Sequence, residues 1–199
     1  MPRKDFTEII CIIDRSGSMD RIKEDAIGGF NTFLEGQKGL PGTAGMTLCL
    51  FNDGYSIIHN GVNIQEVPKL DEYSYIPGGT TALLDAVGRT IDAVGERLAN
   101  TPEEERPDKV LVCIITDGLE NASREYKKDQ IKERIKHQSE KYNWEFIYLG
   151  ANQDAFAEAG DIGISRGSTM AFCSTKMGVT KVYDDLHQRT TDYRKTGKI

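Results

Sequence analysis

The sequence predicts an α/β fold with a doubly wound, mostly parallel sheet, one antiparallel edge strand and helices on both faces. Two continuous apolar runs, 9–13 and 110–115, are typical of strands buried on both faces of a sheet. Between such runs lie stretches whose apolar residues recur at helical spacing, and this alternation favours parallel strands joined by helices. The turn sequence Asn52-Asp53-Gly54 predicts a hairpin, which requires one antiparallel pair.

In the first part of the chain, the strand at 9–13 leads to a helix whose apolar residues recur every three or four positions. These residues are Ile22, Ala26, Ile27, Phe30 and Phe33. The segment 36–45 contains several glycines and a proline and is expected to be a loop. Strands are expected at 46–51 and 55–58, on either side of the hairpin turn.

An amphipathic helix is the clearest element of the second part of the chain. Its apolar residues step by three and four over several turns: Leu84, Val87, Ile91, Val94 and Leu98. The acidic stretch 101–108 is expected to be a surface loop. The remaining strands and helices are expected at 110–115, 131–142, 145–149, 169–173 and 179–193.

Length and composition fit one globular domain that fills 1–199, with a core at about 7–150 and a last strand and helix in 151–199. The net charge of −6 argues against non-specific nucleic-acid binding, which needs a basic face. No stretch approaches the roughly 20 apolar residues that span a bilayer. Neither nucleic acid nor membrane is therefore expected as a partner.

The cysteines and histidines show no metal or disulfide pattern. Cys11, Cys49 and Cys113 lie inside apolar runs, where cysteine behaves as a small hydrophobic residue. No C-x-x-C spacing occurs, and the three histidines are isolated from one another and from the cysteines. Scattered cysteines of this kind fit a reducing compartment, so a cytoplasmic location is expected.

Hydroxyl and carboxylate side chains gather at the predicted ends of strands and at the start of one helix. They are Asp14, Ser16, Ser18, Thr80, Thr81 and Asp117. In doubly wound folds a ligand sits outside the carboxyl ends of the strands, so these side chains are expected to converge. Ligands that are all oxygen select a hard cation, Mg²⁺, Mn²⁺ or Ca²⁺, rather than zinc.

Each of these segments also has a purely local explanation. Ser18 or Asp20 is a suitable cap for the helix near Ile22, and a threonine suits the start of the helix at 84–98. Asp117-Gly118 is a common turn sequence. Taken together, three separate segments that place oxygen atoms at one edge of the sheet favour a cation site.

The residues carry a resemblance to a known family. Asp14-Arg-Ser16-Gly-Ser18 resembles the D-x-S-x-S motif of von Willebrand factor A domains, which forms their metal-ion-dependent adhesion site. Gly78-Gly79-Thr80 resembles the second loop of that site, and Ile115-Thr116-Asp117-Gly118 resembles the third. The motifs stand in the family's order, and the likeness covers about 7–149. It implies the Rossmann-like fold of these domains.

The resemblance also implies roles. Ser16 and Ser18 would bind the metal directly, Thr80 directly or through water, and Asp14 and Asp117 mostly through water. The Gly-Gly-Thr match favours Thr80, with Thr81 as the alternative ligand or as a helix cap. Other polar residues are candidates for the surroundings of the site and are individually typical of turns and caps: Asn52, Asp53, Glu120, Asn121, Asn152 and Asp154.

The function that the resemblance implies is metal-dependent binding of a protein partner, whose Asp or Glu carboxylate completes the coordination of Mg²⁺, Mn²⁺ or Ca²⁺. Small bacterial and phage relatives often act with AAA+ ATPases or in stress-response systems. The alternative is a Mg²⁺-dependent phosphoryl-transfer enzyme that uses Asp14 as the acceptor. The dehalogenase pattern needs a second acid at the position of Ser16, and no phosphate-binding loop occurs, so we expect no enzyme.

Overall fold

A computed structural model describes residues 1–151 and 154–199 and shows one six-stranded sheet. The strand order is β3-β2-β1-β4-β5-β6, with β3 antiparallel to β2 and every other pair parallel. The strands are β1 Arg3–Asp14, β2 Thr43–Phe51, β3 Tyr55–Asn63, β4 Pro107–Thr116, β5 Glu145–Gly150 and β6 Thr169–Ala171. The fold class predicted from the sequence is confirmed, including the antiparallel edge strand.

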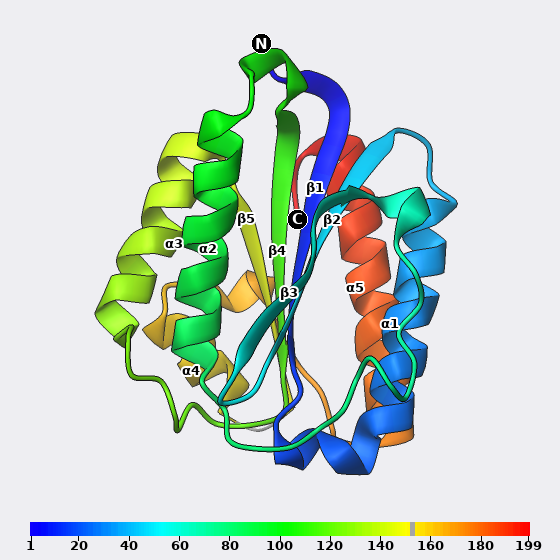
Figure 1. Ribbon diagram of the computed structural model, residues 1–199, viewed down its shortest axis with the longest axis vertical. Helices are drawn as coiled ribbons and strands as arrows, with labels where there is room; N and C mark the ends of the chain where they lie inside the picture. Colours follow the sequence, from blue (N-terminus) through cyan, green and yellow to red (C-terminus); the bar gives the residue numbers. More distant parts are fainter. Residues whose placement is uncertain (152–153) are drawn as a thin grey trace.

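Helices cover both faces of the sheet (Figure 1). One face carries α1 and α5, which pack against each other, and the opposite face carries α2, α3 and α4. The helices are α1 Lys23–Lys38, α2 Leu83–Asn100, α3 Lys128–Tyr142, α4 Ala155–Asp161 and α5 Lys176–Thr196. A 3₁₀ turn, Gly17–Ile22, links β1 to α1.

The central strand β1 shows why the apolar runs form a two-sided core. Ile9, Cys11 and Ile13 point to the face of α1 and α5, whereas Ile10 and Ile12 point to the face of α2 and α3. All five side chains are at most 1% exposed. Side chains of successive strand residues alternate between faces, so a strand covered on both sides must be apolar at every position.

Several elements extend beyond the apolar residues that predicted them. β1 begins at Arg3 and β3 continues to Asn63, because exposed polar residues also pair at the start of the central strand and along the edge strand. The short helix α4 was not predicted, since seven residues are too few for a clear helical period. Among the described residues, no helix is both long and apolar enough to cross a membrane.

Candidate metal centre

The carboxyl ends of β1 and β4 lie side by side at the end of the sheet that is lowest in Figure 1. Ile13 pairs with Ile115 across these two parallel strands. The next residues, Asp14 and Thr116, are therefore neighbours, and the loops that follow both strands start from the same place. The predicted convergence of the first and third motif segments arises from this register.

Asp14 is fully buried and accepts two short hydrogen bonds. The backbone N–H of Ser16 donates to its Oδ1 at 2.6 Å, and the Thr116 hydroxyl donates to its Oδ2 at 2.6 Å. Burial raises the pKa of Asp14; these hydrogen bonds oppose the shift, and the charge of Asp117 adds to it. Ionising this carboxyl is therefore less favourable in the folded protein than in the unfolded chain, and a nearby cation would offset that difference.

The hydroxyls of the first motif connect Asp14 to Asp117. Ser16 Oγ and Ser18 Oγ lie 3.1 Å apart, and the Ser18 hydroxyl donates to Asp117 Oδ1 at 2.5 Å. The second carboxylate oxygen, Asp117 Oδ2, is buried and has no hydrogen-bond partner among the described residues. A buried carboxylate oxygen without a hydrogen bond is costly, and a bound cation would satisfy it.

The threonine at this cluster is Thr81, whereas the Gly-Gly-Thr match favoured Thr80. A β-carbon placed on Gly118 would lie 2.8 Å from Thr81 Oγ1, 3.5 Å from Ser18 Oγ and 3.6 Å from Asp14 Oδ2. Three oxygens from three segments therefore surround the bare face of this glycine. The side chain of Thr81 is buried, and Thr80 is exposed.

Thr81 is held by the loop that follows β4. Its N–H donates to Asn121 Oδ1 at 2.9 Å, and its carbonyl accepts from the N–H groups of Asn121 and Ala122 at 3.0 and 3.2 Å. The alternative role of Thr80 or Thr81 as a helix cap is not realised, because Ala82 directly precedes the first residue of α2. Glu120 Oε2 accepts instead from the N–H of Leu84 at 2.9 Å.

The hairpin turn between β2 and β3 positions the glycines of the second segment. Asn52 Nδ2 donates to the carbonyl of Gly78 at 2.7 Å, and Gly17 N–H donates to the carbonyl of Gly79 at 3.0 Å. Gly79 has a φ of +76°, and a β-carbon there would overlap Asp53 Oδ1. Asn52 and Asp53 thus shape the loop around the site.

Two further candidates come from the segment after β5. Asp154 directly precedes α4, and Asn152 lies outside the described residues. Two residues that support Asp14 were not predicted from the sequence. Thr116 could have been found from its place at the end of β4, whereas Tyr75, whose hydroxyl donates to the Asp14 carbonyl at 2.5 Å, follows from no motif.

The donor set fits a hard divalent cation. It combines the hydroxyls of Ser16, Ser18 and Thr81 with the carboxylates of Asp14 and Asp117, and contains neither imidazole nor thiolate. Among the described residues, no group of three or more His, Cys, Asp or Glu side chains is placed to hold a metal. Oxygen ligands favour Mg²⁺, Mn²⁺ or Ca²⁺.

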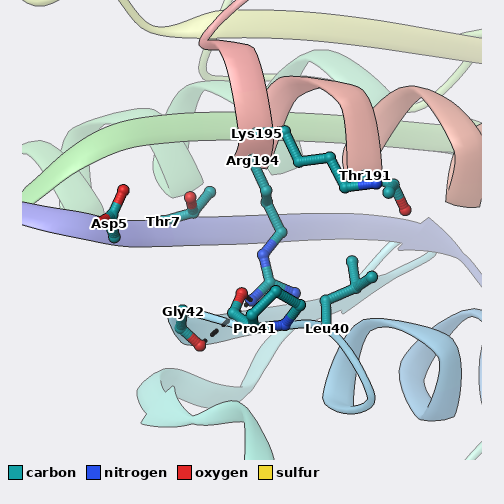
Figure 2. Close-up of a pocket in the computed structure, with 8 residues that line it drawn as sticks. All are labelled: Asp5, Thr7, Leu40, Pro41, Gly42, Thr191, Arg194 and Lys195. Atoms are coloured by element: carbon teal, nitrogen blue, oxygen red, sulfur yellow. Dashed lines mark hydrogen bonds between the residues drawn. The ribbon is translucent and has the colours of Figure 1, made fainter.

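A cavity of about 320 Å³ lies at the opposite end of β1, beside Asp5 and Thr7 (Figure 2). Arg194 of α5 reaches into it, and its guanidinium donates to the carbonyls of Gln37, Pro41 and Gly42. These bonds tie α5 to the end of α1 and to the loop before β2. The residues around the cavity therefore hold α5 in place, and the metal-site residues lie at the other end of the strand.

Comparison with known proteins gives different results for the sequence and for the fold. No protein-family model matches the chain, and no curated protein matches it. Solved structures do match. The von Willebrand factor domain of the type V pili tip protein Mfa5 from Porphyromonas gingivalis has a TM-score of 0.66 at 8% identity, and the match covers 97% of each chain.

Two other solved structures share the fold over most of this chain. Proximal thread matrix protein 1 from the mussel byssus, determined with a zinc-occupied metal-ion-dependent adhesion site, has a TM-score of 0.64 at 16% identity. A von Willebrand factor type A protein from Catenulispora acidiphila has a TM-score of 0.59 at 16% identity. The matches cover 94% and 93% of this chain but 46% and 42% of those proteins. The chain therefore has the von Willebrand factor A fold.

Proposed function

We propose that this chain is a divalent-cation-dependent protein-binding module. The observation that carries the proposal is the group of three hydroxyls and two carboxylates at the carboxyl ends of β1 and β4, in which Asp117 Oδ2 is buried and accepts no hydrogen bond from the described part of the chain. The zinc-occupied site of the byssus protein, which has the same fold, supports divalent-cation binding here.

The geometry supports Ser16, Ser18 and Thr81 as direct ligands, with Thr81 in the role for which the motif favoured Thr80. Asp14 and Asp117 then act by binding water on the metal and by accepting from the ligating hydroxyls, as Asp117 accepts from Ser18. Neutral direct ligands leave most of the charge of the ion uncompensated. Because Mg²⁺ keeps several waters, an Asp or Glu carboxylate of a partner could replace one of them.

The native ion in this proposal is Mg²⁺, with Mn²⁺ or Ca²⁺ as alternatives. The partner is a protein that presents an acidic residue, and an AAA+ ATPase or a component of a stress-response system is a candidate by analogy with small bacterial and phage proteins of this fold. A cytoplasmic location belongs to the same proposal. It is supported by four free cysteines, three of which are buried in the core.

The phosphoryl-transfer alternative is less well supported by the geometry. A nucleophilic carboxylate needs an oxygen that can reach the phosphorus atom. Both oxygens of Asp14 accept hydrogen bonds from the chain, and its side chain is completely buried. We therefore assign Asp14 the role of organising the site.

The proposal is tested by thermal unfolding of metal-stripped protein with and without millimolar Mg²⁺, Mn²⁺ or Ca²⁺. An ion at 100 times its dissociation constant adds about 2.7 kcal/mol to the free energy of unfolding. For a chain of this size, that is a rise in Tm of roughly 5–11 °C. Asp117→Asn keeps the shape of the side chain but removes its charge, and we expect it to abolish the rise.

The matched control is Asp108→Asn, which makes the same chemical change on an exposed residue at the start of β4, at the opposite end of that strand from the site. It should preserve the rise in Tm. If no cation raises the Tm of the wild-type protein, or if Asp117→Asn responds as the wild type does, the metal site is wrongly assigned.

A further inference from the structure

Arg21 is placed beside Asp117 Oδ2, a buried oxygen of the metal centre that lacks a hydrogen bond among the described residues. It lies in the 3₁₀ turn Gly17–Ile22, three residues after Ser18. Its Nη2 is 3.5 Å from Asp117 Oδ2. The Arg21 side chain is 64% exposed, whereas that of Asp117 is fully buried.

The contact between these two groups is electrostatic attraction without a hydrogen bond. A separation of 3.5 Å is beyond normal hydrogen-bond length, and Asp117 Oδ2 accepts no hydrogen bond from the described residues. No side-chain hydrogen bond from the described part of the chain holds the guanidinium in place. An exposed, singly held guanidinium is screened by solvent and can move away at little cost.

A divalent cation bound by Ser16, Ser18 and Thr81 would be close to the same carboxylate. Asp117 is joined to this hydroxyl group through Ser18, which donates to its Oδ1. Two cations near one carboxylate repel each other, so an ion that enters the site must do so against the charge of Arg21.

We propose that Arg21 is a displaceable counter-ion of Asp117 that competes with the divalent cation and lowers the affinity of the site for it. The inference rests on the proposed metal site and concerns how that site is regulated by the chain itself. The buried carboxylate is partly neutralised by the guanidinium, and the entering ion takes over that role as the long side chain moves into solvent.

Mn²⁺ binding to the folded protein, measured by calorimetric titration and by the loss of the free Mn²⁺ resonance, tests the proposal. We compare the wild type with Arg21→Gln, which removes the charge, and Arg21→Lys, which keeps it. The matched control is Lys23→Gln, which removes one positive charge two residues away. Lys23 donates to the Glu72 carbonyl and not to the site.

The dissociation constant of Arg21→Gln should fall roughly three- to tenfold, as expected for removing one charge at short range from a partly screened ion. Arg21→Lys and Lys23→Gln should stay within about twofold of the wild type. Thermal unfolding gives a second measurement, in which the effect of Arg21→Gln differs between protein without metal and protein saturated with Mn²⁺. In chelator, Arg21→Gln should melt at or below the wild-type Tm, and in saturating Mn²⁺ its rise in Tm should exceed the wild-type rise.

The outcomes separate this inference from the proposed function. If the wild type binds Mn²⁺ and Arg21→Gln binds it equally or more weakly, Arg21 is no competitor and instead holds Asp117 in position. If Lys23→Gln tightens binding as much as Arg21→Gln, the effect is one of net charge and the specific contact is unimportant. If neither the wild type nor Arg21→Gln binds Mn²⁺, both proposals fall.

Discussion

Asp14 and Asp117 are both buried carboxylates, but the chain satisfies them differently. Asp14 accepts from Ser16 and Thr116 through both of its oxygens, so it is fixed by the end of the sheet. Asp117 accepts only from Ser18 through Oδ1 among the described residues, and its Oδ2 faces Arg21 without a hydrogen bond. Asp14 therefore organises the site, and Asp117 has an oxygen that can interact with a cation.

Neighbouring threonines provide a test of the site at the scale of one hydroxyl. Thr81→Val replaces the buried hydroxyl near Gly118 with a methyl group of similar size, and Thr80→Val makes the same change on an exposed residue. We expect Thr81→Val to weaken Mn²⁺ binding about tenfold or more, and Thr80→Val to change it less than twofold. Calorimetric titration measures both constants, and the reverse result would restore Thr80 as the ligand.

The loop after β4 links the site to α2. Glu120 accepts from the N–H groups of Leu84, Ala122 and Ser123, and Asn121 binds the backbone of Thr81 on both sides. The negative charge of Glu120 also lies at the start of α2, where the helix dipole favours an anion. The loop therefore takes the place of the threonine cap that was the local alternative in the sequence, and it fixes the position of Thr81.

Glu120→Ala removes these contacts and leaves several backbone N–H groups of the loop without an acceptor. We expect it to lower the free energy of unfolding by about 1–3 kcal/mol, measured by urea denaturation. It should also weaken Mn²⁺ binding, because Thr81 loses its support. Glu104→Ala, which changes an exposed glutamate in the turn before β4, is the control and should alter neither quantity. Equal stability of the two variants would show that the loop is held by other contacts.

The sequence predicted features that follow from local patterns and from strand order better than contacts between residues far apart in the chain. The strands at 9–13 and 110–115 were readable because a strand buried on both faces leaves a continuous apolar run. The grouping of Asp14, Ser16, Ser18 and Asp117 was readable because parallel strands bring their carboxyl ends to one edge. The contact of Asn121 with Thr81 and that of Tyr75 with Asp14 were not, since they join loops whose course depends on the folded sheet.

At the scale of the whole molecule, a buried ion pair and the proposed metal centre lie at opposite ends of β1. Glu8, near the start of the strand, is fully buried and pairs with Arg97 of α2 at 2.7 Å. The Thr47 hydroxyl of β2 donates to the same carboxylate oxygen at 2.6 Å, and Glu8 Oε2 is buried without a hydrogen-bond partner in residues 1–151 and 154–199. This group joins β1, β2 and α2 far along the strand from Asp14.

Removing one partner of a buried ion pair leaves the other charge uncompensated, and this typically costs about 3–5 kcal/mol. We expect Arg97→Met to lower the free energy of unfolding by that amount in urea denaturation. The double variant Glu8→Gln with Arg97→Met should recover most of the loss, because no buried charge is left unpaired. The dissociation constant for Mn²⁺ should stay within about twofold of the wild type in both variants wherever they are folded. A loss of Mn²⁺ binding in the folded double variant would instead show that the two ends of β1 are coupled through the sheet.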